Sequence, residues 1–321
     1  MVNCQETGNL DDHWSGHLGN QRDWLWRGWQ VRYTFLRPPR GAGLSGQLPL
    51  LLLHGFGASI GHWRHNLPVL GASHPVYALD LLGFGASQKA FANYSVDLWI
   101  EQVYDFWRTF IGTPLILVGN SIGSLIALAA AAAHPEMVAG VVMISLPDPG
   151  LRQEMMPAWL APAVTAIERF FSSPVLLRPL FYGVRRPNLI RQWAKLAYYN
   201  PEAVTAELVE ILSTPPQDRG AARTFCLLFQ ALAGGNFGPS VRSILPQIQV
   251  PLLLIWGRQD RMIPPQVVQP SHFLAYNSRL QLIELDQAGH CPHDECPKQV
   301  NQAILQWIAD ACAVSSWASV S

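Results

Sequence analysis

Short runs of apolar residues recur along the chain, with stretches of helical periodicity between them. The runs that we expect to form strands are Leu50–Leu53, Val76–Leu79, Leu115–Val118, Val138–Ile144, Leu252–Trp256 and Leu280–Leu285. Short, predominantly apolar runs of this length are typical of buried parallel strands. The pattern therefore predicts an α/β fold with a mostly parallel central sheet and helices on both faces. The alternating segment Trp29–Leu36 predicts an edge strand.

This alternation stops between Pro147 and about Ser240 and resumes at Val250. The interruption contains 11 of the 25 prolines and no apolar run that resembles a buried strand. We therefore predict an α/β core at 1–147 and 241–315, an inserted helical cap (a lid) at 148–240, and a loose tail at 316–321. The helical segments expected in the cap are Pro157–Phe171, Leu189–Tyr199 and Pro201–Leu212.

The segment Leu115–Ala133 carries no charge and is about as long as a bilayer core is thick. Gly119-Asn120-Ser121 interrupts it, and its two halves differ in character. The first half is a short branched run, whereas Ser124–Ala133 is rich in alanine and is followed by His134-Pro135. We interpret the segment as a strand, a sharp turn and a helix instead of a membrane span.

Composition narrows the possible function classes. The 321 residues include 22 basic and 22 acidic side chains, and 49% are hydrophobic, which excludes a wholly disordered chain. Zero net charge disfavours a dedicated nucleic-acid-binding protein. The five cysteines favour a reducing compartment over a disulfide scaffold. The acidic N-terminal residues predict neither an export signal nor a transit peptide, so we expect a cytoplasmic location.

The motif Gly119-Asn120-Ser121-Ile122-Gly123 matches G-x-S-x-G, the pattern of a nucleophile elbow. It lies between the predicted strand and helix. The small residues let neighbouring backbones approach, and the serine hydroxyl is presented at a helix N-terminus, where negative charge is favoured. The alternative is an ordinary strand-to-helix turn with a capping serine. We predict that Ser121 is a catalytic nucleophile.

A serine attacks only when a base accepts its proton. His290 follows the last predicted strand and is the predicted base. His293 is its rival and is interpreted as a structural neighbour that is hydrogen-bonded or solvated. Asp260 follows the preceding strand and is the predicted acid that orients the imidazole, with Asp148 as the alternative. Asp294 is interpreted as a loop or capping residue.

Acyl transfer also requires donors for the developing oxyanion. The backbone N–H groups of Phe56 and Ile122 are the predicted pair, because Phe56 follows a strand and Ile122 follows the nucleophile. His54 is interpreted as a structural histidine of the same loop. The side chains of Phe56, Asn120 and Trp159 are the candidates for lining the substrate pocket.

Three other features suggest different chemistry. The segment Asp80–Ser87 contains a G-x-G, but the third glycine of a dinucleotide fingerprint is missing, so we predict a tight turn beside the site. His290–Cys296 contains four metal-ligand residue types, but no second ligand pair is visible, and we predict neither a metal nor a cofactor. Basic residues in the cap are interpreted as a solvated face, and docking on an anionic membrane surface is the alternative. They are Arg178, Arg185, Arg186 and Arg191.

Taken together, the elbow, the loop at 54–57, the segment at 80–87 and the late Asp260 and His290 resemble the α/β-hydrolase superfamily over about residues 24–312. The resemblance implies the α/β-hydrolase fold. Dehalogenases and epoxide hydrolases of this fold carry Asp at the nucleophile position, so the serine at 121 disfavours their chemistry.

A narrower similarity concerns Asn120 beside the nucleophile and the stretch at 288–295. Both are similar to the pheophytinase and chlorophyll dephytylase group of plants and cyanobacteria. This resemblance implies an esterase that hydrolyses the phytyl ester of pheophytin or chlorophyll and releases phytol. It also implies a triad of Ser121, Asp260 and His290.

We therefore expect a serine carboxylic-ester hydrolase that acts on a large apolar ester, with a chlorophyll-type pigment as the first choice. Partners would be this small-molecule substrate, no nucleic acid, and an internal thylakoid-type membrane in peripheral contact with the cap. The alternatives are a carbon–carbon bond hydrolase of ring-cleavage products and a lipid or acyl esterase. A pigment- or lipid-binding protein on a hydrolase scaffold is the alternative from another class.

Overall fold

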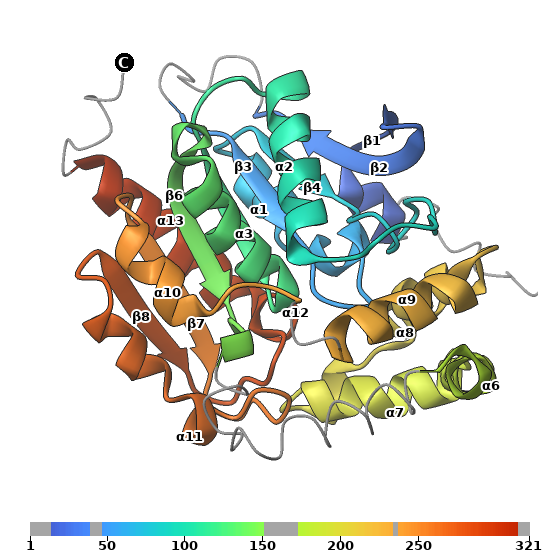
Figure 1. Ribbon diagram of the computed structural model, residues 1–321. Helices are drawn as coiled ribbons and strands as arrows, with labels where there is room; N and C mark the ends of the chain where they lie inside the picture. Colours follow the sequence, from blue (N-terminus) through green and yellow to red (C-terminus); the bar gives the residue numbers. More distant parts are fainter. Residues whose placement is uncertain (1–13, 39–46, 151–172, 234–236, 314–321) are drawn as a thin grey trace, which may run out of the picture.

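The computed structural model describes residues 14–38, 47–150, 173–233 and 237–313. Within these residues the centre is an eight-stranded sheet with the order β1-β2-β4-β3-β5-β6-β7-β8 (Figure 1). Neighbouring strands from β4 to β8 pair in parallel, and β2 pairs antiparallel with both β1 and β4. The strands are β1 (Asn20–Trp26), β2 (Trp29–Leu36), β3 (Leu50–Leu53), β4 (Val76–Leu79), β5 (Leu115–Asn120), β6 (Val138–Ile144), β7 (Leu252–Gly257) and β8 (Leu280–Leu285).

The predicted α/β fold with a mostly parallel sheet is confirmed, and one strand assignment is corrected. Every apolar run forms a strand; β3, β4, β5, β6 and β7 are buried along their length, whereas β8, at the edge of the sheet, is buried only at Leu280. However, β2 is not the edge strand: it lies between β4 and β1, and β1 was missed. The first residues of β1 are polar and largely exposed, since an edge strand with one solvated face requires no apolar run. Arg27 and Gly28, both at positive φ, close the tight hairpin.

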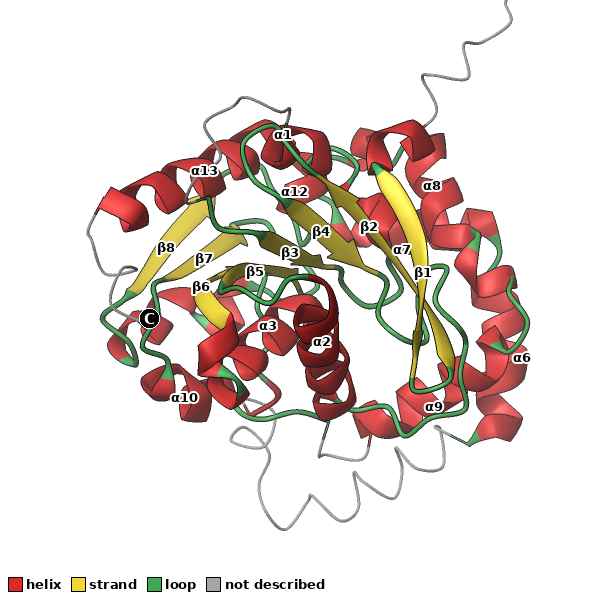
Figure 2. Ribbon diagram, turned by 90° about the horizontal axis from the view of Figure 1, so that it is seen from above, coloured by secondary structure: helices red, strands yellow, loops and turns green. Residues whose placement is uncertain are grey.

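Helices cover both faces of the sheet (Figure 2). Helices α2 and α3 pack on one face together with α10, and α1 and α13 pack on the other. Two apolar layers therefore enclose the sheet. The helices outside the cap are α1 (Leu67–Gly71), α2 (Val96–Phe110), α3 (Ile122–Ala133), α10 (Val241–Ile244), α11 (Pro265–Val268), α12 (Pro292–Glu295) and α13 (Pro297–Ala313). The 3-10 turns outside the cap are η2 (Trp14–Leu18), η3 (Ile60–Trp63), η4 (Pro135–Met137), η7 (Leu245–Gln247) and η8 (Pro270–Ala275).

The uncharged segment at 115–133 forms the predicted strand, turn and helix. Helix α3 is buried on most sides, because its alanines allow it to lie close against the sheet and against α2. Among the described residues, no helix has the length and apolar content needed to span a bilayer.

The cap region contains four helices among its described residues, and they lie at the carboxyl-terminal side of the sheet (Figure 1). Helix α6 packs on α9, and α7 packs on α8. The expected helix at 157–171, Trp159 and the tail at 316–321 lie outside the described residues. The cap elements are α6 (Pro174–Val184), α7 (Pro187–Ala197), η5 (Pro201–Ala203), α8 (Ala206–Ser213), η6 (Pro215–Gln217) and α9 (Ala221–Ala233).

The expected helix at 201–212 is divided in two. A short 3-10 turn ends at Ala203, and α8 starts after Thr205, whose hydroxyl accepts a hydrogen bond from the Leu208 N–H at 3.2 Å. This capping hydroxyl fixes the start of α8, so the division follows from local side-chain chemistry.

Candidate active site

Ser121 occupies a sharp turn between β5 and α3. Its backbone has φ 53° and ψ −121°, a conformation that is strained for a residue with a Cβ. Its N–H donates to the Ile144 carbonyl at 2.8 Å, which ties the turn to the neighbouring strand β6. Glycines on either side make the turn possible, because a Cβ on Gly119 would lie 2.2 Å from the Gly123 backbone. The predicted elbow therefore has the geometry that presents a serine hydroxyl.

Substitution of Gly123 by alanine is expected to lower the free energy of unfolding by about 3 kcal/mol. The new Cβ would lie 2.3 Å from the Leu53 carbonyl oxygen and 2.7 Å from that of His54, and both are backbone atoms. Urea denaturation measures the change. Gly183→Ala is the matched control, since a Cβ there meets nothing within 4 Å. Equal stability of the two variants would contradict this account of the elbow.

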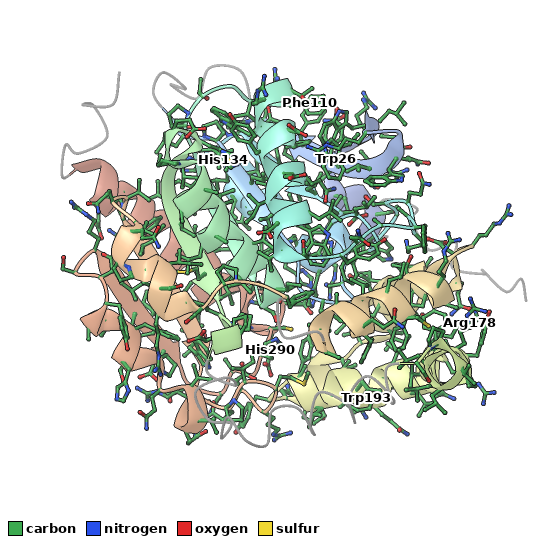
Figure 3. All side chains as sticks on the ribbon, in the orientation of Figure 1. Trp26, Phe110, His134, Arg178, Trp193 and His290 are labelled. Atoms are coloured by element: carbon green, nitrogen blue, oxygen red, sulfur yellow. The ribbon has the colours of Figure 1, made fainter. Side chains whose placement is uncertain are left out.

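Asp260 and His290 are joined by a hydrogen bond of 2.8 Å between Oδ2 of the acid and Nδ1 of the ring. Both are buried, and His290 lies at the carboxyl end of the sheet below α3 (Figure 3). The other carboxylate oxygen of Asp260 accepts the N–H groups of Met262 and Ile263, each at 2.8 Å. The acid is thus held on both oxygens, and the imidazole is left with Nε2 for proton transfer.

Asn120 links this pair to the elbow. Its side-chain amide donates to the His290 carbonyl at 3.2 Å, and its side-chain oxygen lies beside Gly55. Among the described residues, the Ser121 hydroxyl and the His290 imidazole share no hydrogen bond, so the Asn120 side chain connects the elbow to the loop of His290. Asn120 is buried, and its polar atoms face the protein. A pocket-lining role for Asn120 stays a prediction.

The loop that follows β3 lies against the nucleophile. A Cβ on Gly55 would lie 3.5 Å from the Ser121 Cβ, which places Phe56 next to the elbow. His54 has the structural role expected: its ring accepts the Leu81 N–H at 3.1 Å and bonds the Gly55 carbonyl at 2.7 Å. Burial lowers the pKa of His54, which favours the neutral ring that this arrangement needs. Among the described residues, the backbone N–H groups of Phe56 and Ile122, the predicted oxyanion donors, bond no protein acceptor.

The loop that carries His290 is fastened directly to the cap, which the sequence analysis missed. The His290 N–H donates to the Ala197 carbonyl at 2.6 Å, at the end of α7. The Glu295 carboxylate accepts the Gly289 N–H at 2.7 Å and the Asn200 N–H at 2.6 Å. Gly289 is required at this contact, because a Cβ would lie 2.4 Å from the Ala197 oxygen. The glycine before the histidine was the one available signal.

A buried polar cluster lies beneath this junction. The Tyr198 hydroxyl donates to Asp294 at 2.6 Å and contacts the His62 ring at 2.8 Å, and Arg64 donates to the other Asp294 oxygen at 2.6 Å. Asp294 is therefore a buried ion-pair partner, which corrects its interpretation as a loop or capping residue. His293 is also corrected: it is fully buried against Trp63 and His62, and neither ring nitrogen has a hydrogen-bond partner among the described residues.

Acidification is expected to destabilise the fold through these histidines. Burial lowers the pKa of His62 from 6.5 to about 4 and lowers the pKa of His293 well below 6.5. Between the lowered pKa of each buried ring and the ordinary value of 6.5, the unfolded chain binds protons that the folded chain does not. The free energy of unfolding therefore falls as pH falls through this range. His62 alone contributes about 2 kcal/mol of loss between about pH 7.5 and about pH 5.

Urea unfolding at the two pH values measures this loss. His54 acts in the same direction, whereas the burial-raised pKa of Asp80 opposes it. His62→Gln is expected to reduce the pH dependence, because the glutamine does not titrate. A free energy of unfolding that is independent of pH across this window would contradict the assignment.

Asp148, the alternative acid, has different contacts. Its Oδ1 accepts the N–H groups of Gly150 and Val241, each at 3.0 Å, and its Oδ2 lies 3.9 Å from the Arg242 side chain. The carboxylate therefore joins the chain as it leaves the core to the chain as it returns. The carboxylate that bonds the His290 imidazole is that of Asp260.

The remaining candidate features have structural contacts. Asp80 is buried and accepts the N–H groups of Ile60 and Ala86, each at 2.7 Å, which holds the predicted tight turn. Among the described residues, no group of three or more His, Cys, Asp or Glu side chains is arranged to hold a metal ion.

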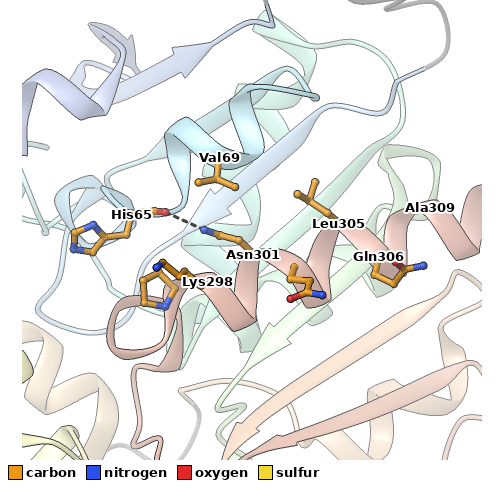
Figure 4. Close-up of a pocket in the computed structure, with 9 residues that line it drawn as sticks. His65, Val69, Lys298, Asn301, Leu305, Gln306 and Ala309 are labelled. Carbon is orange, nitrogen blue, oxygen red and sulfur yellow. Dashed lines mark hydrogen bonds between the residues drawn. The ribbon is translucent and has the colours of Figure 1, made fainter.

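A surface groove of about 670 Å³ lies between α1 and α13, lined by Val69, Asn301 and Leu305 among others (Figure 4). It lies apart from Ser121 and His290.

A model of the "Alpha/beta hydrolase family" matches residues 50–303, which is most of the chain. This chain belongs to the alpha/beta hydrolase family. The match spans β3 to α13 and so includes the elbow and the loops that carry Asp260 and His290. The fold is that of an α/β hydrolase, as the sequence motifs indicated, and the family supports a hydrolase.

Among similar proteins, the dihydrolipoyllysine-residue acetyltransferase component of an acetoin cleaving system of Pseudomonas putida is 28% identical over 83% of this chain. Chloroplastic pheophytinase of Arabidopsis thaliana is 27% identical over 81% of it. This α/β hydrolase spans only 65% and 60% of the lengths of those two relatives. The crystal structure of a bacterial membrane phospholipase A is 26% identical, with a TM-score of 0.70 and coverage of 93% of this chain and 88% of that chain.

Proposed function

We propose that this hydrolase is a serine carboxylic-ester hydrolase with an acyl-enzyme mechanism. The observation that carries the proposal is the 2.8 Å hydrogen bond between Asp260 and His290, on a loop that Asn120 ties to the strained elbow of Ser121. An ordinary strand-to-helix turn requires neither the strained serine nor a buried acid–imidazole pair. Together they supply a nucleophile, a base and an orienting carboxylate.

In this mechanism His290 Nε2 accepts the Ser121 proton while Oγ bonds to the ester carbonyl carbon. The Phe56 and Ile122 N–H groups donate to the resulting oxyanion. When the intermediate collapses, the C–O bond to the alcohol breaks and the imidazolium gives the alcohol its proton. A water molecule then loses a proton to His290 and attacks the acyl carbon; the bond between that carbon and Ser121 Oγ breaks, the imidazolium returns the proton to Oγ, and the acid is released. No step of this mechanism requires a cofactor.

A row of aromatic rings supports a large apolar substrate. Phe56 beside the nucleophile lies 5.3 Å from Phe84 and 6.0 Å from Phe229, measured between ring centroids. Phe229 lies 4.3 Å from Phe225, which in turn lies 5.1 Å from Phe181 on α6. The row extends from the predicted oxyanion loop into the cap. Such a wall suits a long hydrocarbon chain or a flat conjugated ring.

We propose the phytyl ester of pheophytin or chlorophyll as the substrate. The support is the similarity to Arabidopsis pheophytinase, the Asn120–Ser121 pair and the stretch at 288–295. Because this pigment resides in membranes, we also propose that the enzyme works from the cytoplasm at an internal, thylakoid-type membrane.

The test is incubation with pheophytin a, chlorophyll a, p-nitrophenyl esters and a ring-cleavage dienoate, with the products separated by chromatography. Release of phytol and the dephytylated pigment, in preference to cleavage of the other substrates, is the expected result. Cleavage of the dienoate alone would favour a carbon–carbon bond hydrolase. Failure of Ser121 to react with a fluorophosphonate would favour a pigment- or lipid-binding protein.

A lipid acyl ester is the second candidate. It is favoured by the similarity to the bacterial membrane phospholipase A. The aromatic row suits an acyl chain as well as a phytyl chain, so a phospholipid belongs in the same substrate panel. Turnover of phospholipid without turnover of pigment would select this candidate.

A further inference from the structure

Helix α6 is apolar on nearly all sides but is buried on only one. Leu177 and Phe181 face α9 and are buried. The remaining sides present Val175, Leu180 and Tyr182, with exposed fractions of 81%, 52% and 52%. A helix that is apolar all round is normally buried all round. The outer side of α6 is therefore suited to an apolar environment other than the rest of the protein.

Helix α7 continues this surface beside α6. Trp193 and Leu196 lie one turn apart and are exposed by 59% and 42%, and Tyr199 follows the end of the helix. Figure 3 shows Trp193 on α7 and Arg178 on α6, both at the outer side of the cap. We call the set Val175, Leu176, Leu180, Tyr182, Trp193, Leu196 and Tyr199 the apolar cap face.

The charge around this face has one sign. The segment 173–200 contains five basic residues and no acidic residue, in a chain whose net charge is zero. Among the described residues, no carboxylate pairs with Arg178, Arg186 or Lys195, which are all exposed. The Arg185 guanidinium lies 4.7 Å from the centre of the Tyr182 ring, so a cation borders the apolar residues directly. A rim of cations around exposed aliphatic residues and a tryptophan complements an anionic lipid surface.

We propose that the apolar cap face docks on an anionic lipid bilayer. The aliphatic side chains and Trp193 enter the boundary between headgroups and acyl chains, and the three exposed cations contact the lipid phosphates. A water-soluble protein partner would not require this separation into an apolar centre and a cationic rim. The proposal concerns binding alone, so it stands or fails independently of the ester hydrolase function.

Docking would also place the reaction centre near the lipid. Helix α7 ends at Ala197, whose carbonyl bonds the His290 N–H at 2.6 Å. The aromatic row reaches α6 at Phe181, directly behind the outer face. The docked surface is therefore connected to the catalytic loop by a hydrogen bond and to Phe56 by contiguous rings.

Co-sedimentation of the full chain with vesicles tests the proposal. We expect binding to phosphatidylcholine vesicles that contain phosphatidylglycerol, and weaker binding without the anionic lipid or in high salt. Combined Arg178→Glu, Arg186→Glu and Lys195→Glu should lower the partition coefficient about fivefold for each cation lost, on the order of 100-fold for the three together. The matched control reverses Arg22, Arg279 and Lys298, which are exposed elsewhere and change the net charge equally.

A second readout addresses the apolar residues. Brominated lipid should quench the tryptophan fluorescence of the wild type, and Trp193→Phe should remove that part of the quenching. Circular dichroism and turnover of a soluble p-nitrophenyl ester should be unchanged in both charge variants, which shows that they are folded. Equal loss of vesicle binding in both charge variants, or no vesicle binding at all, would overturn the proposal. So would a concentration-dependent dimer that Trp193→Phe abolishes without any effect on vesicle binding, because the face would then bind a second copy.

Discussion

Replacement of Ser121 by alanine is expected to lower kcat for ester hydrolysis by about 10⁶-fold, the size of effect seen when a triad serine is removed. The reason is that the covalent intermediate forms on this hydroxyl, and His290 and Asp260 have no function in the mechanism without it. Initial rates with a p-nitrophenyl ester and a phytyl ester measure the loss. KM for the residual reaction should change little, because the aromatic row is untouched.

Ser145→Ala is the control for this substitution. Ser145 also has a positive φ and is fully buried, and within the part of the chain that the structure describes its hydroxyl has no hydrogen-bond partner, so its removal breaks no hydrogen bond there. We expect wild-type kcat for this variant. Full esterase activity of the Ser121→Ala protein would refute the mechanism.

Asp260→Asn is expected to lower kcat by about 10⁴-fold while the fold remains intact. In the wild type the carboxylate accepts from His290 Nδ1, which leaves Nε2 free to accept the serine proton. An asparagine can place its NH₂ group there and select the tautomer that cannot act as the base. It also removes the negative charge that stabilises the imidazolium. Single-turnover kinetics separates this loss from a change in substrate binding.

Asp148→Asn distinguishes the two candidate acids. Because Asp148 bonds the backbone at Gly150 and Val241, its substitution should affect the free energy of unfolding more than kcat. If the Asp148 variant lost activity by the larger factor and the Asp260 variant did not, the assignment of the acid would be wrong.

The parallel strands and the loops behind them were predictable for one physical reason. A strand buried on both faces must be apolar along its length, so Leu50–Leu53 and Val138–Ile144 were visible in the sequence. Polar residues that follow such strands meet at one edge of the sheet. This rule alone brought Asp260 and His290 together, although 30 residues separate them. The elbow could be recognised from the sequence because close backbone contacts leave room only for glycine at 119 and 123, and this requirement produces the G-x-S-x-G spacing.

The rest depended on contacts that leave no local pattern. Strand β1 carries a polar sequence because its edge position requires little burial. The pair Arg64–Asp294 joins residues 230 positions apart, and His62–Tyr198 joins residues 136 apart, so neither has a periodic signature. His293 was expected to be hydrogen-bonded or solvated like most polar side chains, but aromatic neighbours enclose it.

The junction at Ala197 and Glu295 has a consequence for engineering. Cap exchange between related hydrolases is an obvious route to new substrates, and it treats the lid as a module with two cut points. Here a third attachment exists, because residues 197–200 form part of the support of the base. A chimaera that replaces the whole lid would lose that support together with the old specificity. A transplanted lid should therefore retain this short stretch from the recipient.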